Sequence, residues 1–307
     1  MPSTDRIPYD EFSMFHENAE EFGIPYAGPP VVRREAVDVG DGRRLSALVW
    51  GTGPAEAVFL HGGAQNAHTW DTVALALDRP LVAVDLPGHG HSDGPRTSSV
   101  AVDENARDIA AAVRALAPDA GVVVGMSLGG MTTLALADEF PELVRAAVLV
   151  DVTPGVDHEK SSQIAAFING PESFENFDEI LARTVEYNPT RTVASLRRGI
   201  LHNAVQRDDG SWVWRYQRFR AAEAGVGDGS FPEFGGLWDA VDRLAVPLML
   251  VRGMLPQSVV DDADEAELRR RKPDTRVVHV AEAGHSVQGD TPVELARFIE
   301  DFAGWVR

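Results

Sequence analysis

The sequence predicts an α/β fold, in which helices cover both faces of a mostly parallel sheet. Short apolar runs that fit buried strands recur along the chain, at 57–60, 81–84, 122–126, 146–150, 248–251 and 277–280. Helical patterns lie between or after these runs, at 104–116, 131–140, 263–271 and 293–305. Continuous apolar runs fit strands that are buried on both faces, and strands that alternate with helices form parallel sheets.

An insertion interrupts this alternation after residue 152, and the pattern resumes at Pro247. The insertion contains helical patterns at 161–168, 173–187 and 191–203 and a possible hairpin at 206–216. We therefore expect a lead-in at residues 1–33, a core domain formed by 34–154 and 241–307, and a mainly helical cap at 155–240. Ligands bind at the carboxyl ends of the strands in open α/β sheets, and the cap is placed to cover that edge. Near the start of the core, the turn Gly40-Asp41-Gly42 predicts a hairpin.

Composition narrows the class of protein. The 307 residues carry a formal net charge of −19, which disfavours binding to nucleic acid or to anionic membranes. There is no cysteine, so disulfides, thiolate nucleophiles and cysteine-ligated metals are excluded. The N-terminus has no signal-peptide pattern and no apolar stretch approaches a membrane span, so we expect a cytoplasmic protein.

The pentapeptide Gly125-Met126-Ser127-Leu128-Gly129 matches the pattern G-x-S-x-G at a predicted strand-to-helix junction. In this setting a sharp, strained turn projects the serine hydroxyl above the sheet. The glycines leave room where the strand end and the helix start nearly touch. Ser127 is therefore the predicted nucleophile.

A strand that runs into His61-Gly62-Gly63-Ala64 predicts an oxyanion hole. Acyl transfer needs two backbone N–H groups that face the developing oxyanion. Leu128, the residue after the nucleophile, provides one, and we expect Gly63 to provide the other, with Ala64 as the alternative. We expect His61 to brace its loop rather than to act as the base.

His285 is the predicted general base. It follows the last predicted strand, in the loop Gly284-His285-Ser286, and such a position brings it next to the nucleophile turn. The chain order serine, acid, histidine is the one expected for this type of sheet.

Two positions compete for the acid that orients the histidine. Asp151 closes the apolar run 146–150, where a buried carboxylate needs a partner. Asp261 and Asp262 follow the strand at 248–251, but they are more typical of the first turn of a helix. We favour Asp151 and keep Asp261 or Asp262 as the alternative.

These motifs resemble the α/β-hydrolase superfamily over residues 34–307. Within it, the sequence is similar to bacterial serine esterases of the mycobacterial type, in which the acid lies on the strand after the nucleophile helix. Asp151 stands 24 residues after Ser127, the spacing of that group, so the resemblance also implies Asp151 as the acid. The loop 253–258 departs from the commoner superfamily pattern because it holds no carboxylate.

The predicted function is hydrolysis of a small-molecule carboxylic ester through an acyl-enzyme, without a metal or an organic cofactor. The alternatives are carbon–carbon bond hydrolysis or perhydrolysis on the same triad, and a ligand-binding protein that has lost turnover. We expect Ala64, Met126, Trp212 and Trp214 to contact the substrate. The two tryptophans share one face if they lie on a strand, so they either line an acyl pocket or form the core of the cap. Oligomeric state and substrate identity are not indicated.

Overall fold

The computed structural model describes residues 6–96, 101–156, 159–217 and 234–304. Its centre is an eight-stranded sheet in the order β1-β2-β4-β3-β5-β6-β10-β11. The strands are β1 (Val32–Gly40), β2 (Arg43–Trp50), β3 (Ala57–Leu60), β4 (Leu81–Val84), β5 (Val122–Met126), β6 (Ala147–Val150), β10 (Leu248–Gly253) and β11 (Arg276–Val280). The β1–β2 hairpin and the β2–β4 pair are antiparallel, and every pair from β4 to β11 is parallel.

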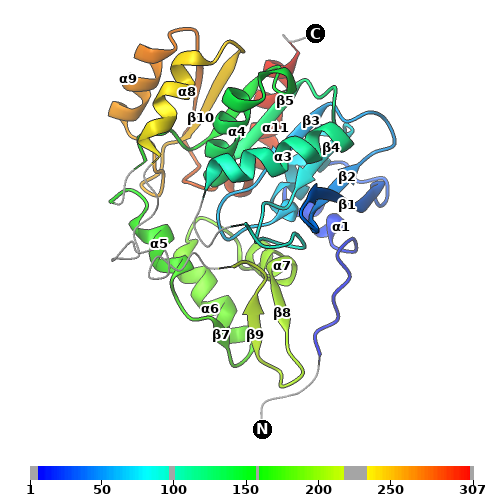
Figure 1. Cartoon of the computed structure of the whole chain (residues 1–307). Coiled ribbons are helices and arrows are strands. Elements are labelled where there is room, and N and C mark those ends of the chain that lie inside the picture. The colour runs from blue at the N-terminus through cyan, green and yellow to red at the C-terminus, as the bar shows by residue number, and fades with distance from the viewer. Residues whose placement is uncertain (1–5, 97–100, 157–158, 218–233, 305–307) are drawn as a thin grey trace.

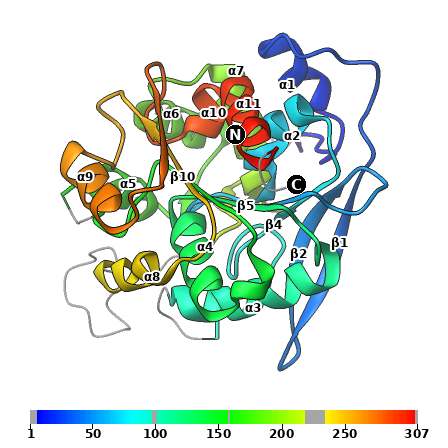
Figure 2. The same ribbon diagram turned by 90° about the horizontal axis from the view of Figure 1, so that it is seen from above.

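Helices cover both faces of this sheet (Figures 1 and 2). One face carries α3 (Val102–Leu116), α4 (Leu128–Glu139) and α8 (Trp238–Arg243), with α9 (Asp262–Arg271) beside α8. The other face carries α1 (Phe15–Glu21), α2 (Asp71–Leu77), α10 (Val287–Asp290) and α11 (Pro292–Ala303). Short 3₁₀ helices lie at η1 (Ala67–Trp70), η2 (Pro141–Leu143) and η3 (Gly235–Leu237). Among the described residues, no helix combines the length and apolar character needed to cross a membrane.

Burial on both faces explains the continuous apolar runs of the central strands. In β3, Val58 and Leu60 belong to the cluster under α3 and α4, whereas Phe59 belongs to the cluster that contains Trp70 and Phe302. Each of these side chains is at most 1% exposed. Burying one large apolar side chain contributes about 1.5–3 kcal/mol, so neither face of the strand tolerates polar residues.

The described residues between β6 and β10 that precede α8 fold apart from the sheet, beside the ends of the parallel strands (Figure 1). They contain α5 (Ser162–Ile168), β7 (Ser173–Phe174), α6 (Phe177–Tyr187), α7 (Val193–Asn203), β8 (Ala204–Gln206) and β9 (Trp212–Trp214). These three strands form a small antiparallel sheet in the order β7-β9-β8. We call this group of elements the cap.

Some helix boundaries differ from those predicted. The helix expected from residue 173 begins at Phe177, because Phe174 pairs with Trp212 and the Asn176 side chain caps the helix by accepting from the Glu179 N–H. α8 begins at Trp238 and packs beside α4, so it spans the predicted return to the core at residue 241. The last helix is described as far as Ala303, and Trp305 lies outside the described residues.

The N-terminal segment connects the core with the cap rather than only covering a surface. Phe15 is 1% exposed and packs against Trp50 of β2, with ring centroids 4.9 Å apart. On the cap side, Arg198 of α7 donates from Nε to Asn18 Oδ1 at 2.8 Å and forms an ion pair with Glu21. α1 is therefore held by apolar packing on one side and by charge on the other.

We expect Gly125→Ala to lower the free energy of unfolding by about 1–3 kcal/mol, because its Cβ would collide with the carbonyl of Gly129 and with Thr133. Urea unfolding measures this loss. Gly121→Ala, just before the same strand, is the matched control, since its Cβ meets only Glu56 O at an ordinary 3.6 Å. Equal stability of the two variants would contradict the close packing inferred here.

Candidate active site

Ser127 lies in the sharp turn between β5 and α4. Its backbone has φ 51° and ψ −119°, a conformation that non-glycine residues rarely adopt. The Ser127 N–H donates to Val150 O at 3.3 Å, and its carbonyl accepts from the Gly130 N–H at 2.8 Å. A Cβ at Gly129 would collide with the carbonyl of Leu60. The turn is therefore strained and held by the neighbouring strands, which leaves the hydroxyl above the sheet.

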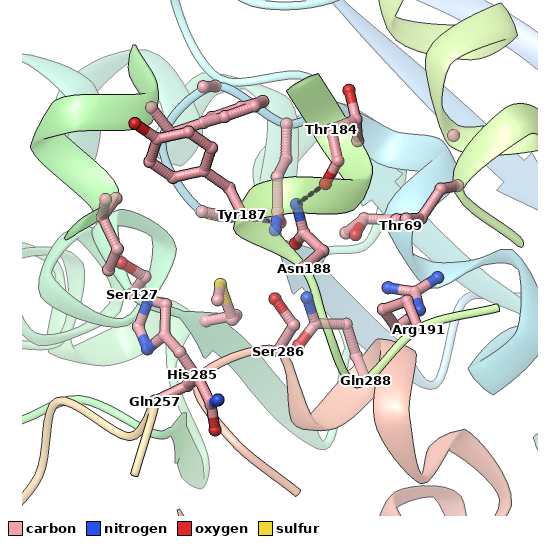
Figure 3. Close-up of a pocket in the computed structure, with 18 of the residues that line it drawn as sticks. Thr69, Ser127, Thr184, Tyr187, Asn188, Arg191, Gln257, His285, Ser286 and Gln288 are labelled. Atoms are coloured by element: carbon pink, nitrogen blue, oxygen red, sulfur yellow. Dashed lines mark hydrogen bonds between the residues drawn. The ribbon is translucent and has the colours of Figure 1, made fainter. Parts of the chain in front are cut away.

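His285 and Asp151 are in direct contact. His285, in the loop after β11, has Nδ1 2.9 Å from Asp151 Oδ2. Asp151 directly follows β6, which lies between β5 and β10 in the sheet. Figure 3 shows the Ser127 and His285 side chains next to each other at one end of a pocket. The ends of parallel strands thus bring together a hydroxyl, an imidazole and a carboxylate that are distant in sequence.

The Asp151 carboxylate is fully buried and accepts three further hydrogen bonds. Oδ1 accepts from the Gly253 N–H at 2.9 Å and from Ser258 Oγ at 2.6 Å, and Oδ2 accepts from the Val259 N–H at 3.1 Å. All three donors come from the end of β10 and the loop after it. This is the loop in which the sequence shows no carboxylate, and here it provides donors instead.

Asp261 and Asp262, the alternative acids, have other partners. Asp261 caps α9 through a reciprocal capping box with Asp264 and forms an ion pair with Lys160 at 2.9 Å. The hydrogen bond from the Asp264 N–H and the Lys160 ammonium lower the pKa of Asp261. Asp262 pairs with Arg252 at 2.8 Å. Neither carboxylate contacts His285 in the described part of the chain, so both have roles at the start of a helix.

His61 braces the loop that follows β3. Its Nδ1 lies 2.7 Å from Gly62 O, and its Nε2 accepts from the Leu86 N–H at 2.9 Å. Since the carbonyl must accept and the N–H must donate, the ring is the neutral Nδ1–H form. Burial lowers the pKa of His61, which agrees with a neutral ring.

His89, in the loop after β4, connects that loop to the loop after β3. Its Nδ1 lies 3.0 Å from Pro87 O, and its Nε2 accepts from the Ala64 N–H at 3.1 Å. Burial lowers the pKa of His89 to about 3, so this ring is also neutral. Because the Ala64 N–H is engaged, it is a poor oxyanion donor. The N–H groups of Gly63 and Leu128 have no hydrogen-bond partner among the described residues, so both are available.

Asp85 fixes the loop that follows β4. Its carboxylate accepts from the Ala67 N–H at 2.7 Å, from Arg34 Nη1 at 2.8 Å and from the His91 N–H at 3.0 Å. Burial alone would raise the pKa of Asp85, but Arg34 holds it below its usual range. Ser92 Oγ donates to the Asp85 carbonyl at 2.6 Å, which closes the turn.

One cluster among the described residues has the side chains of a metal site: His68, Asp71 and His202. His68 Nδ1 lies 2.8 Å from Asp71 Oδ2, and His202 Nδ1 lies 2.9 Å from the Tyr9 hydroxyl. The two imidazoles stack with centroids 3.8 Å apart and an interplanar angle of 12°. Parallel stacked rings direct their lone pairs side by side rather than toward one point, so we assign no metal to this cluster.

A cavity of about 520 Å³ extends from Ser127 and His285 into the space under the cap. Of the predicted substrate-contacting residues, Ala64, Met126 and Trp214 line it. Trp212 is not among the lining residues, which agrees with the alternative that it belongs to the core of the cap. Its ring packs edge-on against Phe177 with centroids 5.0 Å apart, inside the small core of the cap.

The cavity also has a polar end that the sequence did not reveal. Figure 3 shows Arg191 and Gln288 side by side, away from Ser127. Arg191 precedes α7 of the cap, and Gln288 lies in α10, just after His285. No local pattern marks either residue, since they meet only when the cap folds over the sheet.

The strained serine turn, the buried aspartate–histidine pair and the free backbone donors are those of a serine hydrolase. The chain belongs to the α/β-hydrolase family, whose model matches residues 57–298. It is 44% identical to the esterase Rv0045c of Mycobacterium tuberculosis over 302 residues, which cover 95% of this chain and 96% of that protein. The resemblance and the fold predicted from the sequence are therefore confirmed.

Solved structures agree with this assignment. A structure of the same M. tuberculosis esterase has a TM-score of 0.83 and 42% identity, over 96% of this chain and 99% of that one. A second relative, the 2-(acetamidomethylene)succinate hydrolase of Mesorhizobium japonicum, is 31% identical over 269 residues, which cover 87% of this chain and 93% of that protein. A solved structure of an E-2-(acetamidomethylene)succinate hydrolase has a TM-score of 0.78, at 29% identity, over 89% of this chain and all of that one.

We expect His89→Gln to weaken the dependence of the free energy of unfolding on pH in the acidic range. Unfolded histidine has a pKa of about 6.5, whereas the pKa of His89 is about 3, so the unfolded chain alone binds this proton between the two values. Stability therefore falls as the pH is lowered through that window. Removing His89 reduces the slope by about 1.4 kcal/mol per pH unit.

Urea unfolding at several pH values between about 4 and 6 measures this slope. The exposed His16→Gln is the matched control, since it removes a surface histidine by the same substitution. A slope in His89→Gln that equals that of the unmodified chain would refute a neutral buried role for this ring.

Proposed function

We propose that this chain hydrolyses small-molecule carboxylic esters through an acyl-enzyme on Ser127. The observation that carries the proposal is the 2.9 Å contact between His285 Nδ1 and the buried Asp151 carboxylate, beside Ser127 at one end of a cavity. The similarity to an esterase along almost the full chain supports the same reaction. The oxyanion donors are proposed to be the N–H groups of Gly63 and Leu128.

In the first half of the reaction, Ser127 Oγ attacks the ester carbonyl carbon and its proton passes to His285 Nε2. Asp151 accepts from Nδ1–H, which holds the ring in the tautomer that leaves Nε2 free to take the proton. The carbonyl oxygen becomes an oxyanion near the two backbone donors. His285 then protonates the alcohol oxygen as the bond to the carbonyl carbon breaks, and the alcohol leaves.

In the second half, His285 takes a proton from water, and the resulting hydroxide attacks the acyl-enzyme carbonyl. The tetrahedral intermediate collapses, Ser127 Oγ regains the proton from His285, and the carboxylic acid is released. No redox step occurs. The reaction uses only an ester and water, so it needs no metal or organic cofactor from the chain.

We expect Ser127→Ala to lower kcat for a nitrophenyl ester by about 10⁶-fold and to abolish labelling by a fluorophosphonate probe. The probe reacts with an activated serine, so labelling also separates an enzyme from a ligand-binding protein of this fold. Near-complete esterase activity in Ser127→Ala would disprove the nucleophile assignment.

We expect Asp151→Asn to lower kcat by about 10⁴-fold, because the amide favours the wrong tautomer of His285. Asp261→Asn is the matched control, since asparagine caps a helix nearly as well as aspartate and Asp261 has no contact with His285. Steady-state kinetics on the same ester measures both. A crippled Asp261→Asn beside an active Asp151→Asn would overturn the choice of acid.

A further inference from the structure

The polar end of the cavity holds a cation without a carboxylate partner. Arg191 is partly buried and lines the cavity just before α7. Its Nη2 donates to Ser195 Oγ, whereas its Nε is buried and has no hydrogen-bond partner. No ion pair to Arg191 occurs within the part of the chain that the structure describes.

The nearby carboxylates have other hydrogen-bond partners, and among the described residues neither forms an ion pair with Arg191. Asp290 accepts from Thr190 Oγ1 at 2.8 Å and from the Gly284 N–H at 2.9 Å. Glu21 forms an ion pair with Arg198, the other arginine that lines the cavity. Arg198 is thus satisfied by the N-terminal segment, and Arg191 is left with its charge facing the cavity.

Gln288 adds a second unsatisfied group next to Arg191. It is 1% exposed, and neither atom of its side-chain amide has a hydrogen-bond partner. A Cβ at the adjacent Gly289 would collide with Arg191 Nη1, so the guanidinium lies directly over the backbone of α10. Figure 3 shows the two side chains adjacent, at the side of the pocket away from Ser127.

Such a pair favours an anionic ligand. Burial lowers the pKa of Arg191 because its charged form loses hydration, and the nearby charges of Asp290 and Glu21 offset this loss only in part. A carboxylate would accept from the guanidinium and from the Gln288 amide as charge-assisted hydrogen bonds. One cation and one neutral amide suit a carboxylate monoanion better than a phosphate dianion, because Asp290 and Glu21 already add negative charge nearby.

We propose that Arg191 and Gln288 form a carboxylate subsite, and that the preferred substrates are esters with a free carboxylate at the end remote from the scissile bond. Apolar side chains also line the cavity, among them Ile168, Leu196 and Trp214, and they suit a hydrocarbon spacer. This inference rests on the proposed function for its ester class. The charge lies on the acyl part or on the alcohol part of the ester.

Binding to Ser127→Ala tests the subsite without turnover. Titration calorimetry compares monomethyl adipate with methyl adipamate, the neutral amide of the same shape. We expect the charged ester to bind at least about tenfold more tightly, and Arg191→Gln in the same background to weaken it by about tenfold to a hundredfold. Arg191→Gln leaves the affinity for the neutral ester unchanged. Equal affinity for the two esters, or equal weakening of both, overturns the proposal.

Arg197→Gln is the matched control, since it removes the same charge from an exposed position of α7 that makes no described contact. It should keep the preference for the charged ester. If Arg197→Gln lost the preference to the same extent as Arg191→Gln, the ligand would be responding only to the overall electrostatic field of the cap. That result would overturn the subsite.

Turnover by the unmodified chain identifies which part of the ester carries the charge. Monomethyl adipate has its carboxylate on the acyl part, and the acetate ester of a terminal hydroxyhexanoate has it on the alcohol part. The kcat/KM ratio of charged to neutral ester should fall about tenfold to a hundredfold in Arg191→Gln for one of the two. Selective binding of a charged ester without turnover would support the subsite but contradict the proposed function.

Discussion

The carboxylate of Asp151 is the interaction on which the site depends. It is buried without access to water, and four donors surround it: the ring of His285, two backbone N–H groups and the Ser258 hydroxyl. An isolated buried carboxylate would be unstable, so these donors and the acid require one another. Because they come from the ends of β6 and β10 and from the loop after β11, this single side chain fixes the relative positions of three segments.

The loop that carries Gly63 is also held on two sides. Imidazoles of the core contact it on one side, and the cap contacts it on the other. His61 and His89 connect it to the neighbouring loop of the core. On the other side, Asn203 at the end of α7 donates to Ala64 O at 2.6 Å. The backbone N–H of Gly63 therefore lies in a loop with little freedom, which is what a preorganised oxyanion donor requires.

Much of this arrangement follows from local patterns. The strands at 57–60, 81–84 and 122–126 match the structure to the residue, since burial on both faces makes each run apolar throughout and its ends abrupt. Motifs at strand ends predict Ser127 and His285, and the choice of Asp151 follows from its place after an apolar strand. These features depend on short segments and on the order of strands in the sheet.

Other features depend on contacts between distant segments and have no local signal. Trp212 and Trp214 lie on the same short strand, but α6 covers the first and the cavity borders the second. No local sequence pattern marks Arg191 or Gln288, because the two side chains meet only where the folded cap lies against α10. The ion pair between Asp85 and Arg34 of β1 likewise forms only when the first hairpin is in place.

The N-terminal segment has a consequence for how ligands enter and leave. Tyr9 bonds to His202 of the cap, Phe15 packs on the central sheet, and Glu21 pairs with Arg198. A rigid-body hinge motion of the cap would have to break these contacts together, which makes the cap and the core a single cooperative unit. These contacts disfavour a wide opening of the whole cap, and we expect ester and product to exchange through local shifts of side chains and loops around the cavity.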